Sequence, residues 1–264
     1  MPQFAIFAGP AIAGWILVNW GIAIAFTVNV AGYAIYFATI AFLKTPADFK
    51  QAKSQSRSMR QDIVEGARYI LAHKGLSSLL LLVLAGDAVT GAVYQMLPAY
   101  SGTVLHTGVG NVSLLFGAAG LGATIAALWL AQGGAARATP LRVIVAVFGV
   151  AVSVYFLALS NTIAISVAAM LLFGFAGETR RTGTVSIMQL AVDDAQRARV
   201  MSALFLLTRL AGGIGTVTVG AVAEHTGLRL PLVIAATIAL IAWLVIFRKR
   251  REISAAFTET PPPR

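Results

Sequence analysis

Five ionisable side chains lie inside long stretches of the chain that are otherwise apolar. They are Asp87, Glu178, Arg180, Arg181 and Arg209. Charged groups are costly in a hydrocarbon environment, so they usually face a partner or a water-filled cavity and mark an ion or substrate pathway. The chemistry open to these residues is therefore ion pairing, proton transfer and binding of a polar small molecule.

Asp87 begins a stripe of polar, aromatic and small side chains. At helical spacing on the same side it is followed by Thr90, Gly91, Tyr94 and Gln95. This mixture is what a substrate cavity requires. Because burial disfavours the charged form of a carboxyl group, we expect that Asp87 can load and release a proton. The alternative is a structural aspartate bonded to a neighbouring helix.

Glu178, Arg180 and Arg181 form a second group. Glu178 and Arg181 are three residues apart and can pair on one face of a helix. Arg180 points elsewhere and needs its own partner, for which Asp87 is a candidate on charge grounds. A helix that ends near Thr179 would instead make both arginines anchors at the cytoplasmic membrane surface.

Arg209 is followed on one face by Gly213, Thr216 and Gly220. Small residues let membrane helices approach closely. We therefore expect Arg209 to lie in a tight helix contact and to meet an acid or carbonyl oxygens, with a place in the substrate or proton pathway as the alternative.

The residue types needed for catalysis or metal binding are sparse. The chain has no cysteine, and its histidines, His73, His106 and His225, are too scattered for a metal site. It has no Ser-His-Asp, phosphate-loop or metal-ligand spacing. We expect neither an enzyme nor a metal or other cofactor.

The composition indicates which kind of secondary structure positions these side chains. The chain is 58% hydrophobic and 11% charged, and its apolar residues run continuously, whereas strands of a membrane barrel would alternate. This predicts an all-α, polytopic membrane protein with about eight transmembrane helices. The expected crossings are near 3–20, 22–43, 76–100, 110–131, 141–159, 163–190, 200–223 and 230–247.

The net charge of +10 is distributed in a way that argues against nucleic acid as a partner. Lysines and arginines fill alternate connections, at 44–75, 132–142 and 193–199, and also the tail at 248–264. This is the positive-inside pattern. It predicts a multi-pass protein of the plasma (inner) membrane with both termini in the cytoplasm.

The connection at 44–75 is basic, and its second half has the pattern of an amphipathic helix. Ser58 and Gln61 match a capping box. The apolar residues that then recur on one face are Met59, Ile63, Ala67, Ile70 and Leu71. We expect this helix to lie on the cytoplasmic membrane surface and contact lipid headgroups, or simply to join two bundles. The tail at 248–264 is expected to be disordered.

Three segments together resemble one family. The segment containing Gly9, Pro10 and Gly14 resembles the Gly-Pro-x-x-Gly-Gly motif on the fifth helix of exporters in the major facilitator superfamily, with Ala13 in place of a glycine. Residues 65–73 resemble the segment before the seventh helix in the enterobactin-exporter-like, or transmembrane secretion effector, branch. Residues 188–201 resemble its loop between helices ten and eleven, with Asp193 and Ala198 as departures.

The resemblance implies a partial major-facilitator fold. Residues 1–43 would be the last two helices of an N-terminal bundle, 44–75 the linker, 76–247 a complete C-terminal six-helix bundle and 248–264 the tail. A further N-terminal segment of four helices is then expected. The same alignment places Gln189 at the cytoplasmic end of its helix, which favours a continuous helix through Thr179.

The implied function is secondary active transport, in which two bundles rock around a midplane site. We expect proton-coupled efflux of a small molecule such as a drug or siderophore, with protons, the substrate and membrane lipids as partners. Three arginines against two acids favour an anionic or neutral substrate. The alternative is a truncated, non-transporting membrane fragment or scaffold.

Overall fold

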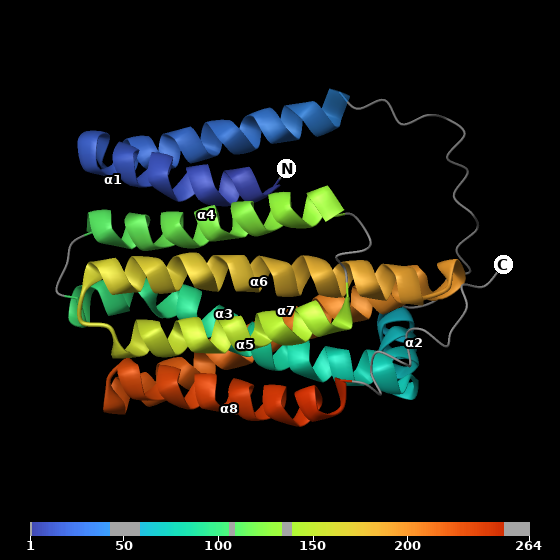
Figure 1. Ribbon diagram of the computed structural model, residues 1–264. Helices are drawn as coiled ribbons and strands as arrows, with labels where there is room; N and C mark the ends of the chain where they lie inside the picture. The colour runs from blue at the N-terminus through green and yellow to red at the C-terminus, as the bar shows by residue number, and fades with distance from the viewer. Residues whose placement is uncertain (1, 43–58, 106–108, 134–138, 251–264) are drawn as a thin grey trace.

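The computed structural model describes residues 2–42, 59–105, 109–133 and 139–250, and these residues form helices joined by short turns (Figure 1). The elements are α1 (Pro2–Phe42), α2 (Met59–Ala72), α3 (Lys74–Thr103), α4 (Val109–Gly133), α5 (Pro140–Leu159), α6 (Ile163–Ala191), α7 (Asp194–Thr226) and α8 (Arg229–Arg248). Seven described helices are long and apolar enough to cross a membrane. The chain is thus an all-helical polytopic membrane protein.

The element α1 is two helices that meet at Gly21. It extends over the two crossings expected at 3–20 and 22–43, and of these only the second, Ala23–Phe42, is among the seven described helices long and apolar enough to cross a membrane. Gly21 has a φ of 81° and a ψ of 173°, a conformation that side chains other than that of glycine rarely adopt. The chain reverses there, so the two halves run back along each other (Figure 1). The second half, Ala23–Phe42, exposes nearly all of its apolar side chains, as a lipid-facing helix does.

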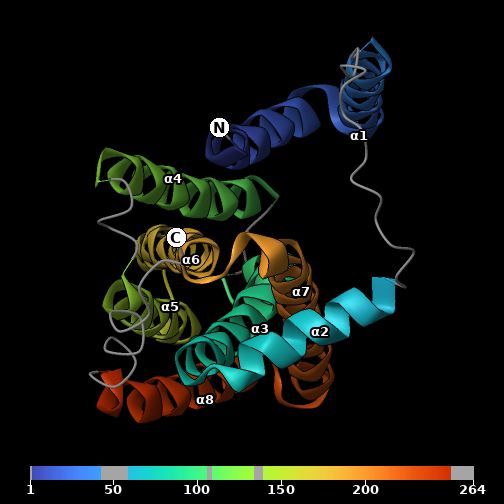
Figure 2. The same cartoon turned by 90° about the vertical axis from the view of Figure 1, so that its right-hand side faces the viewer.

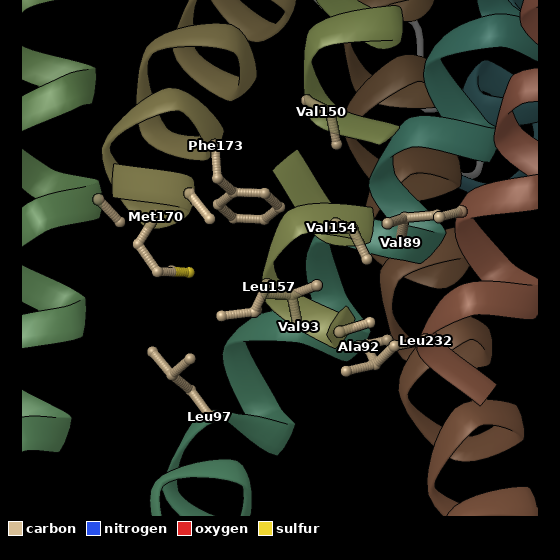
Figure 3. Close-up of a cluster of buried hydrophobic side chains, with 14 of the residues drawn as sticks. Val89, Ala92, Val93, Leu97, Val150, Val154, Leu157, Met170, Phe173 and Leu232 are labelled. Carbon is tan, nitrogen blue, oxygen red and sulfur yellow. The ribbon is translucent and has the colours of Figure 1, made fainter. Parts of the chain in front are cut away.

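The bundle is built around α3 and α6. Helix α6 packs between α4 and α5, and α3 packs against α7 and α8 (Figure 2). One buried cluster joins α3, α5, α6 and α8 (Figure 3). Its members include Val89, Val93, Leu97, Val150, Val154, Leu157, Met170, Phe173 and Leu232. This apolar core holds the three helices that carry the charged residues in one arrangement.

Glycines set the spacing between the major helix pairs. A Cβ atom at Gly91 would lie 2.4 Å from the Gly212 carbonyl oxygen, and one at Gly215 would lie 2.0 Å from the Ala88 oxygen. These contacts form the α3–α7 seam. Because no side chain intervenes, backbone meets backbone, as is common where membrane helices associate.

Helix α2 lies across one end of the bundle, against α7 and α3 (Figure 2). Its amphipathic character was expected, and its partner differs from the expected one. Ile63, Ala67 and Ile70 pack into a cluster with residues of α3, α6 and α7, so this apolar face meets protein instead of lipid. Leu71, which was expected on the same face, is 67% exposed and does not join this cluster. Ser58 lies outside the described residues.

Candidate functional site

A cavity of about 610 Å³ lies between α3, α6 and α7. All seven residues that the sequence marked for a substrate or proton pathway line it: Asp87, Tyr94, Gln95, Glu178, Arg180, Arg181 and Arg209. At 1.5 Å per residue, Asp87 is roughly 20 Å along α3, which is near the middle of a crossing. The structure therefore brings together, around one cavity, residues from three separate helices.

Arg180 and Asp87 form an ion pair between α6 and α3. The Arg180 Nη2 atom donates to Asp87 Oδ1 at 2.6 Å, and its Nη1 atom donates to the Val83 carbonyl oxygen at 3.3 Å. The Arg180 side chain is 2% exposed and that of Asp87 20%. Gly86 leaves room for this arginine, since a Cβ atom there would lie 3.0 Å from Arg180 Cδ.

The course of α6 decides between the two interpretations of these arginines. The helix is continuous from Ile163 to Ala191, so the alternative that ended it near Thr179 is wrong. Asp87, the partner suggested on charge grounds, is the partner that Arg180 has. Through this ion pair Asp87 is a link between α3 and α6 as well as part of the cavity wall.

Glu178 and Arg181 form the expected pair within α6. Arg181 donates from Nε at 3.1 Å and from Nη2 at 2.9 Å to Glu178 Oε2, and the Thr182 hydroxyl donates to the other carboxylate oxygen. The Glu178 side chain is 4% exposed, whereas that of Arg181 is 55% exposed. The acid is thus held in place, while its counterion can reach the open cavity.

Arg209 differs from the expectation that it would pack against an acid or carbonyl oxygens. It is exposed on the cavity side of α7. Among the residues that the structure describes, no hydrogen bond or ion pair satisfies its guanidinium. The packing role belongs to Gly212 and Gly215, which contact α3, whereas a Cβ atom at Gly213 would meet open space.

Aromatic rings form another part of the cavity wall. Tyr94 lies 5.9 Å from Phe116 in a stacked arrangement and 5.4 Å from Phe173 in an edge arrangement, measured between ring centroids. Gln95 lines the cavity beside Tyr94, and Phe205 contributes a half-exposed ring from α7. The cavity therefore offers apolar surface together with charge.

The exporter-type motif lies in the first half of α1. The backbone of Gly9, Pro10 and Gly14 is helical, and their side-chain surroundings are outside what the structure describes. Their role in an exporter stays a prediction.

The sequence interpretation missed a polar contact at the α2 end of the bundle. Arg199 at the start of α7 pairs with Asp62 at 3.1 Å and with Glu65 at 2.9 Å. A Cβ atom at Gly66 would lie 2.2 Å from the Arg199 carbonyl oxygen. Tyr69 lies on the same helix α2, where burial and the negative charge of Asp193 raise the pKa of its hydroxyl group. The sequence contained a signal for this contact, because Asp62 and Glu65 are acids three residues apart on one helix and Arg199 is one of the arginines of the basic connection at 193–199.

Metal-ligating residues do not cluster in the described part of the chain. No group of three histidine, aspartate or glutamate side chains there could hold a metal ion. His106 lies outside the described residues.

Comparison with known proteins covers nearly the whole chain. Residues 4–260 match the model of a family, MFS_3, described as transmembrane secretion effector. No curated protein matches the chain.

Proposed function

The chain belongs to the transmembrane secretion effector family of the major facilitator superfamily, and from this premise we propose that it is a secondary active transporter that exports a small molecule. Members of this superfamily are membrane transporters. The proposal has three finer parts: the direction of transport is export, transport is coupled to protons, and the substrate is drug-like or siderophore-like.

The cavity is the observation that carries the proposal. Its volume of about 610 Å³ lies within the range of roughly 300–1,000 Å³ that small-molecule sites occupy. It combines aromatic walls with ionisable groups near the middle of three membrane helices. Intramembrane charges mark substrate or ion pathways in transporters, and transporter sites lie near the bilayer midplane.

We assign proton coupling to the two carboxylates of the cavity. Asp87 and Glu178 each accept from one arginine, Arg180 and Arg181 respectively. A rearrangement that separates either pair leaves a carboxylate that can be neutralised by a proton. In this scheme, a movement of α6 against α3 separates Arg180 from Asp87 and so couples protonation of Asp87 to a change in cavity access, whereas the Glu178–Arg181 pair lies within α6 and opens by a change of side-chain conformation.

We infer the orientation of the bundle in the membrane from the basic residues at its two ends. The α2 end of the bundle carries the described basic residues of the connections, including Arg197, Arg199 and Lys249, and the opposite end carries Arg229. The positive-inside rule places the α2 end in the cytoplasm of a plasma-membrane protein. Alternating access also requires a second bundle, to which we assign the two helices of α1.

The test measures proton movement in everted membrane vesicles that hold an acidic interior. Matched aromatic compounds with anionic, neutral and cationic groups are added, and the decay of the pH gradient is followed. We expect one class to release protons in the native protein and not in Gly177→Leu, because a side chain at Gly177 projects into open space within the cavity. Glu224→Gln, at an exposed acid outside the cavity lining, is the control.

Two outcomes would count against the proposal. If no compound dissipates the gradient, or if Gly177→Leu responds as the native protein does, the chain does not transport through this cavity. The protein would then be a membrane scaffold or non-transporting fragment.

A further inference from the structure

The charges that line the cavity do not cancel. Its lining contains three arginines and two carboxylates, which leaves one positive charge. Arg180 is bound to Asp87, and Arg181 is bound through two of its nitrogens to Glu178. The excess charge is therefore located on the third arginine, Arg209.

Arg209 is placed to act on a molecule in the cavity. It lies near the middle of α7, exposed, with Gly213 and Thr216 on the same face. Gly213 adds no side chain between the guanidinium and the open space. The hydroxyl of Thr216 donates to the Gly212 carbonyl oxygen at 2.9 Å and carries no charge. In the described part of the chain, nothing neutralises Arg209.

An uncompensated arginine near the middle of a membrane helix is costly, and an anionic group that entered the cavity would offset that cost. A guanidinium binds carboxylate, sulfonate or phosphate oxygens through parallel hydrogen bonds. Phe205, one helical turn from Arg209, lines the same cavity with Tyr94. These rings can contact the apolar body of the same molecule.

Resting on the proposed transport function, we propose that the cavity selects amphipathic organic anions and that Arg209 is the residue that determines this specificity. A cation of the same shape meets the positive charge of Arg209, while both acids are already occupied by arginines. A neutral molecule gains only the aromatic contacts. Substrate charge is thus decided at α7, by an arginine that is separate from the two acid–arginine pairs.

The experiment measures binding to the purified full chain in phosphatidylcholine nanodiscs by calorimetric titration. Three ligands of similar shape are compared: naphthalene-2-sulfonate, naphthalene-2-sulfonamide and 2-naphthylmethylammonium. We expect the sulfonate to bind most tightly. Arg209→Gln should weaken it by about tenfold or more, since a hydrogen bond to a charged group is typically worth that factor. Arg209→Lys should recover part of the loss, and the sulfonamide should be unaffected by either change.

Two further variants locate the effect. Gly177→Leu fills the cavity and should abolish binding of all three ligands, and Arg248→Gln, at the exposed end of α8, should leave binding unchanged. Repeating the titration in phosphatidylglycerol nanodiscs separates a soluble anion from a lipid headgroup. If the part of sulfonate binding that depends on Arg209 persists, the site takes a soluble anion; if it disappears, a headgroup occupies the site and the proposal is overturned.

Two other outcomes would separate the anion specificity from the transport cavity. Equal or tighter binding of the sulfonamide or ammonium ligand, blocked by Gly177→Leu but insensitive to Arg209→Gln, would overturn the anion specificity and leave the transport cavity intact. Sulfonate binding that Gly177→Leu does not change would place the ligand elsewhere and overturn both. Retained sulfonamide binding shows that the Arg209 variants are folded.

Discussion

At the scale of single residues, the feature that organises the site is the buried guanidinium of Arg180. Its partners, Asp87 and the Val83 carbonyl oxygen, both lie on α3, and Gly86 provides the space beside it. A buried charge is tolerated when it is paired, and removing one partner leaves the other uncompensated. Arg180 therefore links two helices across the wall of the cavity.

This leads to a prediction about stability. Arg180→Gln should lower the free energy of unfolding by about 3–5 kcal/mol, because it leaves Asp87 without a counterion. The double variant Asp87→Asn with Arg180→Gln should recover part of that loss. A double-mutant cycle, measured by denaturant unfolding in detergent, tests this.

The control is an exposed pair with the same change. Arg197 pairs with Asp194 while 44% exposed, and it also donates to the Gln189 carbonyl oxygen at 3.1 Å. Arg197→Gln should therefore cost about 1–2 kcal/mol, less than Arg180→Gln. Equal effects of Arg197→Gln and Arg180→Gln would show that the Asp87–Arg180 pair has no special role.

At the scale of elements, only some glycines of a helix lie in a close contact with the neighbouring helix. Gly213 and Gly215 are two residues apart on α7, yet only Gly215 lies against the α3 backbone. Local spacing could not distinguish them, because both belong to the same glycine-rich stretch. Similarly, Gly122 and Gly174 make the close α4–α6 contacts, with Leu171 and Ala119 respectively.

The α3–α7 seam supplies the second prediction. Gly215→Ala should destabilise the bundle by about 1–3 kcal/mol, since the added methyl group forces the backbones apart. Gly213→Ala should be neutral or stabilising, because alanine favours helix by about 1 kcal/mol over glycine. Thermal unfolding of the two variants in one detergent distinguishes them; a Gly213→Ala variant as unstable as Gly215→Ala would contradict the seam.

The attachment of α2 gives the third prediction. Arg199 holds Asp62 and Glu65 of α2. Arg199→Ala should speed hydrogen exchange at the α2 amides without unfolding the bundle, because these half-buried pairs lie at one end of the bundle and hold α2 locally. Arg197→Ala, two residues away, should leave α2 exchange unchanged. Unaltered exchange in Arg199→Ala would mean that the apolar face of α2 alone holds the helix in place.

At the scale of the whole molecule, the two ends of the bundle differ in charge and the cavity lies between them. Helix α2 and the end of α8 lie at the same end of the bundle (Figure 1). That end holds Arg142, Arg199 and Lys249, whereas Arg229 is the described basic residue in the turns of the opposite end. By the positive-inside rule, this asymmetry predicts which end of the bundle faces the cytoplasm.

The natural absence of cysteine allows this topology to be tested directly. Thr103→Cys, at an exposed position of the less basic end, should react with a membrane-impermeant maleimide in intact cells. Ala198→Cys and Lys249→Cys should react only after permeabilisation, because the positive-inside rule places them in the cytoplasm. Labelling of Lys249→Cys in intact cells would reverse the orientation.

The sequence alone determined the class of the protein and the approximate helices. Continuous apolar runs must form helices in a membrane because each helix satisfies its own backbone hydrogen bonds. Helical spacing also placed Glu178 beside Arg181, and the same runs identified seven of the residues that line the cavity. These inferences succeed because they depend on residues close together in the chain.

The tertiary structure decided which of those charged groups are satisfied. The bond from Arg180 to Asp87 joins residues 93 positions apart, and Arg209 on a third helix is left facing the cavity. It also decided that α2 packs against α7 and that Gly215, and not Gly213, meets α3. Such outcomes depend on how helices rotate and cross when they pack, and the periodicity of any one helix does not contain that information.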